Sequence, residues 1–336
     1  MQEGPVFIVT GGAGFVGSNL CAALCRRDKT AQLIVVDDFR TGSFANLVEA
    51  FDRAGLGNFT HRIEATCYSR VDWPALIAMH RPAAIFHLGA ITDTTVMDEA
   101  EMLRVNTSGF VPLLHACLNS DTRLVYASSA ATYGSPREGI EKRPFPVSAA
   151  GKPNNVYGFS KWLMECEHRR IAGDSPLVVG LRYFNVFGPG EARKGKMASM
   201  AYQLARQMLE GKRPRVFTPG DQARDQVYVG DVVDCTMAAA GLGERAQVRG
   251  GVYNLGSGVV TSFAQIADAM REGLGWSAAD RPTEFFDMPA SIRAFYQDYT
   301  CADMTATRDG LGWTPRHTPT KAMVQYAKML RQSAGV

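Results

Sequence analysis

A glycine-rich turn near the N-terminus, Thr10-Gly11-Gly12-Ala13-Gly14-Phe15-Val16-Gly17, constrains the fold of this chain more than any other feature. It follows an apolar run at 6–9 that predicts a buried strand, and it leads into a helical pattern at 15–27. In that setting glycines allow a tight turn, close approach of a pyrophosphate and close helix packing. The free N–H groups at the start of the helix then attract phosphate. The turn therefore predicts a dinucleotide site, with a ligand-free glycine turn as the alternative.

Short apolar runs alternate with helical segments through the first half of the chain. Further strands are predicted at 33–36, 84–87, 123–127 and 177–182, and a long helix at 156–172. This alternation predicts an α/β fold, a Rossmann-type doubly wound parallel sheet with a smaller C-terminal lobe. Beyond residue 188 the pattern loosens, with helices at 197–211 and 262–274. We predict that 1–188 is mainly the dinucleotide-binding domain and 189–336 mainly the substrate lobe, with a strand near 252–255 returning to the sheet.

Composition excludes several classes of function. The net charge of the 336-residue chain is only +3, and the basic residues are scattered, which argues against nucleic acid as a partner. No apolar run reaches the length of a membrane span, and no signal peptide pattern opens the chain, so we expect a cytoplasmic protein without a membrane partner. Seven dispersed cysteines are typical of reduced thiols, and six histidines in no ligand cluster predict no metal site.

Tyr157 and Lys161 are four residues apart on a predicted helix, so both lie on one face. An ammonium beside a phenol favours the phenolate and lowers the pKa of the tyrosine, which predicts a proton shuttle at cellular pH. Ser128 and Ser129 follow a predicted strand, where functional residues of such sheets gather. A serine there can bind a substrate oxygen, whereas the alternative is a cap of a helix or turn. Together with the glycine turn, these residues predict hydride transfer on a bound nicotinamide.

The acidic residues after the second strand bear on the choice of cofactor. Asp37 lies where a carboxylate would bind the adenosine ribose hydroxyls. Asp38 adds a negative charge that disfavours a 2′-phosphate, whereas Arg40 could pair with that phosphate. The sequence therefore leaves NAD or NADP open, with a slight preference for NAD.

These motifs resemble the extended short-chain dehydrogenase/reductase family over nearly the whole chain. The resemblance implies oxidation of a sugar carbon by one tightly bound NAD(P) per subunit, with Tyr157 as base, Lys161 lowering its pKa and Ser129 holding the reacting oxygen. We also expect a homo-oligomer, because such folds often assemble symmetrically. The cofactor would contact these residues: Gly11, Gly14, Phe15, Val16, Gly17, Asp37, Asp38, Arg40, Leu88, Gly89, Ala90, Asn106, Tyr157 and Lys161.

More specific segments include Tyr126 to Gly134, Arg182 to Pro189, Lys194 to Ser199, Arg224 to Asp231 and Tyr296 to Asp303. They resemble the branch of the family that inverts carbon 6 of an ADP-linked manno-heptose, a precursor of lipopolysaccharide. This implies transient oxidation and return of the hydride to the other face. It also implies a second shuttle at Lys194 and a nucleotide-sugar substrate. The residues that would bind the substrate are Thr94, Ser129, Asn185, Lys194, Ser199, Arg224 and Tyr296.

Each of three further assignments has an alternative. Lys194 can be a loop lysine in a basic run, Arg224 can form a surface ion pair with Asp225, and Tyr296 can be packed in an aromatic cluster. The segment 134–155 is longer than the resemblance leads us to expect.

Other functions also stay open from sequence. Another nucleotide-sugar epimerase or a 4,6-dehydratase is possible, although Ala130 and Ala131 stand where a dehydratase usually carries an acidic pair. A non-catalytic NAD(P)-binding regulator is the third hypothesis, disfavoured by the intact pair of Tyr157 and Lys161.

Overall fold

The computed structural model describes residues 4–92, 98–134, 142–245, 247–289 and 297–335. Within these ranges the largest sheet has seven strands, all parallel, in the order β10-β6-β5-β4-β1-β2-β3. Its strands are β1 (Val6–Thr10), β2 (Gln32–Val36), β3 (Arg62–Glu64), β4 (Ala84–His87), β5 (Arg123–Ser129), β6 (Val178–Tyr183) and β10 (Gly251–Leu255). This order reverses direction between β1 and β4, which is where doubly wound sheets place their ligands.

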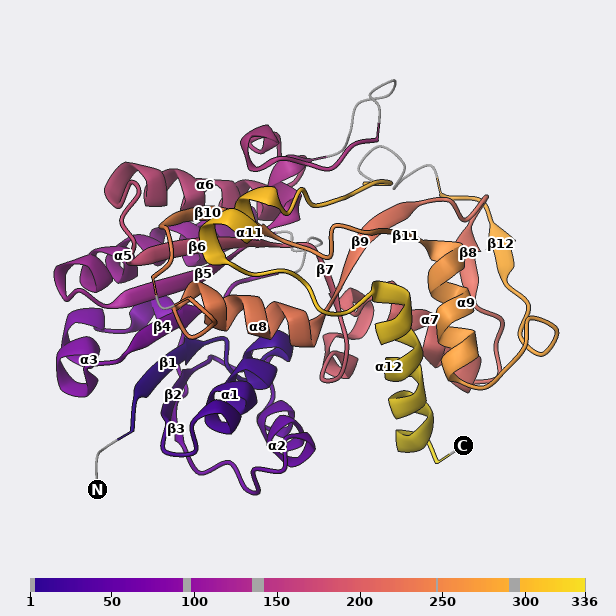
Figure 1. Ribbon diagram of the computed structural model, residues 1–336, viewed down its shortest axis with the longest axis horizontal. Helices are drawn as coiled ribbons and strands as arrows, with labels where there is room; N and C mark the ends of the chain where they lie inside the picture. The colour runs from indigo at the N-terminus through magenta and orange to yellow at the C-terminus, as the bar shows by residue number, and fades with distance from the viewer. Residues whose placement is uncertain (1–3, 93–97, 135–141, 246, 290–296, 336) are drawn as a thin grey trace.

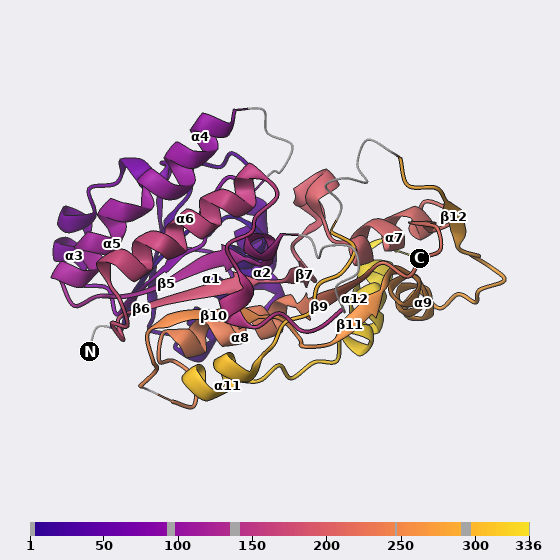
Figure 2. The same cartoon turned by 90° about the horizontal axis from the view of Figure 1, so that it is seen from above.

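Helices cover both faces of the sheet (Figures 1 and 2). One layer contains α1 (Phe15–Arg27), α2 (Phe44–Arg53) and α8 (Val229–Ala239). The other contains α3 (Trp73–His80), α5 (Phe110–Asn119) and α6 (Val156–Ile171). Shorter elements extend this second side or follow strand ends: η1 (Tyr68–Arg70), α4 (Glu99–Leu103), the π-helical η2 (Arg104–Ser108), η3 (Ala130–Tyr133) and η4 (Val147–Ala149).

The strands are apolar throughout because both of their faces are buried. Along β1, Phe7 and Val9 enter the core beneath α1 and α8, whereas Ile8 enters the core beneath α3 and α5. This alternation is the pleat of a strand, and burial of both faces is typical of parallel sheets.

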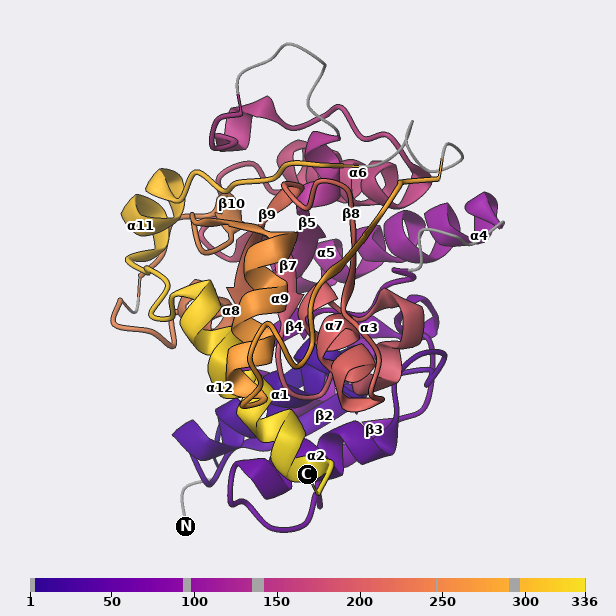
Figure 3. The same cartoon turned by 90° about the vertical axis from the view of Figure 1, so that its right-hand side faces the viewer.

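A second, smaller lobe lies beyond the carboxyl ends of the strands (Figures 1 and 3). Its helices α7 (Met200–Leu209), α9 (Phe263–Gly273) and α12 (Pro319–Ser333) share one apolar core. A three-stranded sheet joins β7 (Asn185–Phe187), β9 (Ala223–Tyr228) and β11 (Val260–Ser262), and a parallel pair joins β8 (Arg215–Phe217) to β12 (Glu284–Phe286). The remaining elements of the described residues are η5 (Ala192–Met197) and α11 (Thr305–Leu311), which packs beside β10.

The predicted fold class is confirmed, and the local boundaries show why some elements differ. The helix expected at 197–211 begins only at Met200, because Ser199 caps it through a hydrogen bond from the N–H of Tyr202. The residues before it form η5, in which Gly195 has a φ of 56° and interrupts the helical geometry. The division near residue 188 stays a prediction, and both α8 and β10 pack on the large sheet.

No helix among the described residues is both long enough and apolar enough to cross a bilayer.

Candidate active site

A cleft of about 1240 Å³ runs along the carboxyl ends of the central strands and extends into the smaller lobe. The sheet side contributes residues such as Gly11, Asp37 and Ser129, and the smaller lobe contributes Lys194 and Arg224. Parallel strands bring their carboxyl ends to one edge, so residues far apart in sequence meet there. Of the residues predicted to form a site, those lining the cleft are Gly11, Gly14, Phe15, Val16, Gly17, Asp37, Asp38, Arg40, Leu88, Gly89, Ala90, Ser129, Tyr157, Lys161, Asn185, Lys194, Ser199 and Arg224.

The glycine turn has no room for side chains on its inner side. A Cβ on Gly17 would lie 2.1 Å from the carbonyl oxygen of Gly11, and one on Gly11 would lie 2.7 Å from the nitrogen of Gly89. Gly14 is the N-cap of α1 and offers no side-chain cap, so the first N–H groups of the helix face the cleft uncapped. Such a helix start binds phosphate, and the turn therefore fits a dinucleotide.

Asp37 is already engaged by the backbone around it. Its carboxylate accepts hydrogen bonds from the N–H of Ala13 and of Phe39, each at 2.9 Å. Burial raises the pKa of Asp37, and these two hydrogen bonds oppose that rise. The residue thus links the glycine turn to the end of β2 while it lines the cleft.

Arg40, which could have paired with a 2′-phosphate, faces two carboxylates instead. Its guanidinium lies 3.4 Å from Asp38 and 3.7 Å from Glu101.

Tyr157 and Lys161 project from the first two turns of α6, which begins at the N-cap Asn155. The Lys161 ammonium is buried and donates to the carbonyl of Ala127 at 2.8 Å. Burial lowers the pKa of Lys161 to about 7. Burial also raises the pKa of Tyr157, while a hydrogen bond with Ser129 opposes the rise.

The pKa of Tyr157 is raised in the folded chain, whereas the sequence led us to expect that it is lowered. The expectation considered only the ammonium beside the phenol, whereas desolvation of the phenol is the largest effect in the folded chain. A tyrosine base therefore needs a positive charge in addition to what these side chains supply. An oxidised nicotinamide carries such a charge when it is bound.

The two adjacent serines have different roles. Ser128 is buried and donates its hydroxyl to Glu165 at 2.6 Å. Ser129 lines the cleft, where its Oγ accepts from the N–H of Ala131 and also contacts Tyr157. Ser129 thus caps η3, as one alternative from the sequence predicted, and it lines the cleft beside the candidate base, while its contact with a substrate oxygen stays a prediction.

Lys194 reaches the cleft from η5. Its ammonium lies 5.4 Å from the centroid of the Phe15 ring, at the start of α1. The residue is at the exposed rim, yet the surrounding chain crowds the ammonium and lowers the pKa of Lys194, with Glu191 opposing. Glu191 itself is buried and accepts from the N–H of Gly188 at 3.0 Å and from both the N–H and hydroxyl of Ser199. The hydroxyl of Ser199 thus donates to Glu191 and caps the start of α7 by accepting from the N–H of Tyr202.

Two other predicted substrate contacts line the cleft from the smaller lobe. Asn185 donates to the carbonyl of Asp225 at 3.1 Å and to Thr300 at 3.2 Å. Arg224 donates to the carbonyl of Gln297 and stacks 5.6 Å from the Phe263 ring. The alternative of a surface ion pair with Asp225 is wrong, because Asp225 is fully buried.

The remaining predicted residues lie elsewhere. Asn106 is buried behind the cleft, where its amide exchanges two hydrogen bonds with Ile91 and donates to Ser160. It therefore fixes the loop after β4 to α6, and its contact with a cofactor stays a prediction. Thr94 and Tyr296 lie outside the described residues.

Sequence reasoning missed the far end of the cleft, formed by Gln203, Gln207, Arg215, Phe217 and Phe286. The rings of Phe217 and Phe286 lie 4.8 Å apart, and the Arg215 guanidinium lies 4.3 Å from the Phe286 ring. The backbone N–H of Arg215 donates to Gln207 at 2.8 Å. No sequence signal joined these residues, because the pairing of β8 with β12 is fixed only by the tertiary fold.

The chain is similar to known proteins both in sequence and in fold. A model of the NAD-dependent epimerase/dehydratase family matches residues 7–256. The chain belongs to that family. The prediction of an enzyme with the chemistry of an NAD-dependent nucleotide-sugar epimerase or dehydratase is thereby confirmed at this level, which disfavours the non-catalytic hypothesis.

Solved structures agree over nearly the full length. The Helicobacter pylori ADP-L-glycero-D-manno-heptose-6-epimerase is 31% identical, with a TM-score of 0.82, covering 98% of this chain and 96% of that one. MoeE5, in complex with UDP-glucose and NAD, is 26% identical, with a TM-score of 0.74 and coverage of 98% and 99%. The Thermotoga maritima UDP-glucose 4-epimerase with UDP-glucose is 24% identical, with a TM-score of 0.80 and coverage of 98% and 99%, a likeness that concerns the fold alone.

Proposed function

We propose that this protein inverts carbon 6 of an ADP-linked manno-heptose by transient oxidation and re-reduction on a bound nicotinamide cofactor. The observation that carries the proposal is the presence of two basic groups from different elements in one cleft, Tyr157 on α6 and Lys194 on η5. An epimerase must return hydride to the opposite face of the carbon that it oxidised, so a proton shuttle is needed for each face. The likeness to the heptose epimerase supports the choice of sugar.

In this proposal the side chains divide the work by position. Tyr157 takes the proton of the hydroxyl at carbon 6, Ser129 orients that oxygen, and Lys161 holds α6 against β5. The glycine turn would hold the cofactor, which would supply the acceptance and return of hydride. Lys194 would serve the other face from η5, where desolvation of its ammonium lowers its pKa and Glu191 opposes this.

The far end of the cleft supports a nucleotide at the other end of the substrate. Phe217, Phe286 and Arg215 offer flat surfaces for a base, and Gln203 and Gln207 line the same end of the cleft. Arg224 would pair with the diphosphate between the base and the sugar. Ser199 and Asn185 would contact the sugar or support the residues that do.

We further propose that the cofactor is NAD rather than NADP. Asp37, Asp38 and Arg40 line the cleft at the end of β2, and Arg40 is paired with Asp38 and with Glu101. A 2′-phosphate would have to displace those pairs. Titration of cofactor-stripped protein should give at least tenfold tighter binding of NAD⁺, and equal affinity for NADP⁺ would overturn this preference.

The decisive experiment is proton NMR of the purified protein with ADP-D-glycero-D-manno-heptose. Appearance of the L-glycero epimer, lost in Tyr157→Phe, is the expected result. If the protein holds cofactor, as its absorbance reports, and yet converts none of this substrate, the heptose assignment is wrong. A UDP-hexose tested alongside would then reveal a 4-epimerase. A homo-oligomer and cytoplasmic residence remain predictions, the former checked by light scattering.

A further inference from the structure

Behind the candidate base, a buried ion pair joins α6 to the sheet. Glu165 and Arg182 are 0% and 1% exposed, and the guanidinium donates to both carboxylate oxygens, from Nε at 2.8 Å and Nη2 at 2.6 Å. Removing two charges from water is costly, and an apolar pair of similar volume is often as stable. A contribution to stability therefore does not explain why the fold contains this ion pair. Its position between α6 and the sheet points to a second role.

Glu165 lies one helical turn beyond Lys161 and two turns beyond the candidate base Tyr157. Tyr157, Lys161 and Glu165 follow one another at intervals of four, so they share one face of α6. Lys161 bonds the carbonyl of Ala127, and Glu165 bonds the hydroxyl of Ser128. Two successive residues of β5 thus hold two successive turns of α6, directly before Ser129.

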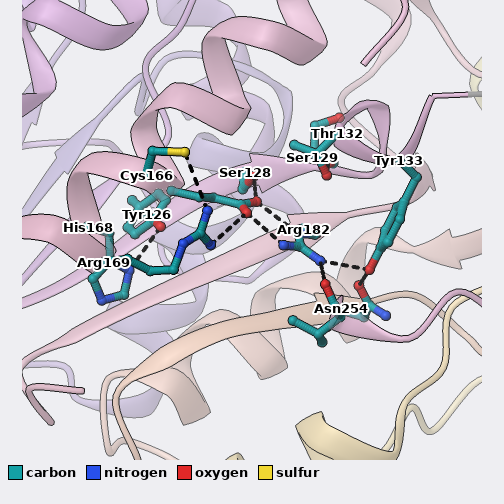
Figure 4. Close-up of polar contacts among 12 residues, drawn as sticks. Tyr126, Ser128, Ser129, Thr132, Tyr133, Cys166, His168, Arg169, Arg182 and Asn254 are labelled. Atoms are coloured by element: carbon teal, nitrogen blue, oxygen red, sulfur yellow. Dashed lines mark hydrogen bonds and ion pairs between the residues drawn. The ribbon is translucent and has the colours of Figure 1, made fainter. Parts of the chain in front are cut away.

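Arg182 extends this connection across the sheet. From β6 its Nη1 donates to the hydroxyl of Tyr133 at 2.9 Å and to the carbonyl of Val147 at 2.7 Å. The Tyr133 hydroxyl donates to Asn254 on β10, as Figure 4 shows beside Arg182. The guanidinium therefore fixes α6, η3 and the segment at Val147 relative to one another, around the end of β5.

We infer that Glu165 and Arg182 are positioning residues, which hold Tyr157 on α6 at the correct place relative to Ser129 on β5. They touch neither the cleft nor a reacting atom, and they act through Ser128 and the helix. A misplacement of about 1 Å can cost about a hundredfold in rate, so a rigid link near the base has a large kinetic effect. The kinetic part of this inference rests on the proposed function.

The test separates positioning from simple stability. Arg182→Met leaves the Glu165 carboxylate without its main partner and should lower the melting temperature and the activity together. The double variant Glu165→Gln/Arg182→Met removes both charges and should recover most of the melting temperature. Its kcat should nevertheless stay at least tenfold below that of the wild type, with KM within twofold. Glu167→Gln, which removes a partly exposed partner of Arg170 on the same helix, is the matched control.

A second measurement needs no substrate. Hydrogen exchange of the amides at 156–161 should be faster in the double variant than in the wild type, with those of α7 as internal reference. If the double variant does not fold, Arg182→Lys replaces it, since a lysine keeps the charge but loses the two-pronged contact. Wild-type kcat together with wild-type exchange in the double variant would overturn the inference. A wild-type protein that turns over no nucleotide sugar refutes the proposed function instead, and exchange alone then decides the positioning role.

Discussion

The two candidate shuttles are built in opposite ways. Tyr157 stands on a helix of sixteen residues whose side chains are tied to the sheet by Lys161 and by the pair of Glu165 and Arg182. Lys194 stands on the short η5, whose regular geometry is broken at Gly195. Both have a buried carboxylate nearby, but Glu165 is neutralised by a guanidinium, whereas Glu191 is held mainly by N–H groups and a hydroxyl.

The difference teaches how one cleft can combine fixed and adjustable groups. A base that must meet a fixed cofactor gains from rigid support, because its geometry decides the rate. A group that would serve the opposite face of carbon 6, after the ketone formed there has turned, benefits from a support with more freedom. We therefore expect the same kind of change to be more costly at α6 than at η5.

The largest expected effect is at the rigid shuttle. Tyr157→Phe removes only the phenol oxygen and should lower kcat by about a thousandfold, within the usual range for loss of a general acid or base. The content of bound cofactor should be unchanged, which absorbance of the purified protein checks. A loss of less than tenfold would mean that Tyr157 is not the base.

At the second shuttle, Lys194→Met should lower kcat by about a hundredfold. The methionine keeps most of the apolar stem beside Phe15, so a loss of activity reports the ammonium or amine rather than packing. Lys212→Met, at an exposed lysine paired with Glu210, is the control and should keep full activity. If Lys194→Met were as active as Lys212→Met, Lys194 would not be a shuttle, and Tyr157 would be left as the one candidate.

Two glycines next to the shuttles offer a direct contrast in stability. A Cβ on Gly158 would lie 2.6 Å from the carbonyl oxygen of Ala131, so Gly158→Ala must push α6 away from η3. We expect a loss of about 2 kcal/mol, typical of overpacking, with a marked fall in kcat. An added Cβ on Gly195 meets nothing within 4 Å, so Gly195→Ala carries only the strain of a backbone at φ 56° and ψ −123°, about 1 to 3 kcal/mol, with little change in kcat. Urea unfolding and kcat of both variants check this contrast, and a marked fall in kcat for Gly195→Ala would contradict the rigid-versus-adjustable comparison.

A further effect is a dependence of stability on pH. The pKa of Lys161 is lowered by burial to about 7, below its value in the unfolded chain. Above pH 7 the unfolded chain therefore binds more protons than the folded one, and stability gains from this residue as pH rises towards about 10. The free energy of unfolding of the wild type minus that of Lys161→Met should thus increase from pH 7 to 9. A flat difference would show that Lys161 is solvated.

Much of the dinucleotide half could be predicted from sequence, because its signals are local. The glycine turn between β1 and α1, and the spacing of Tyr157 and Lys161 on α6, each lie within about twenty residues. The pKa of Tyr157 could not be predicted, since burial depends on what packs around the phenol. The Glu165–Arg182 pair and the Phe217–Phe286 surface join residues from separate strands and helices. Such contacts depend on the tertiary fold, which no short motif encodes.

The path of the chain between the lobes has a consequence for how this scaffold can diversify. After β6 it enters the smaller lobe, returns to the large sheet through α8 and β10, leaves again for β11, α9 and β12, and passes α11 before ending in α12. No single cut therefore detaches the smaller lobe, and recombination cannot replace it as one cassette. New substrate preferences must instead arise by substitutions distributed over several separate stretches, each constrained by the sheet to which the chain returns.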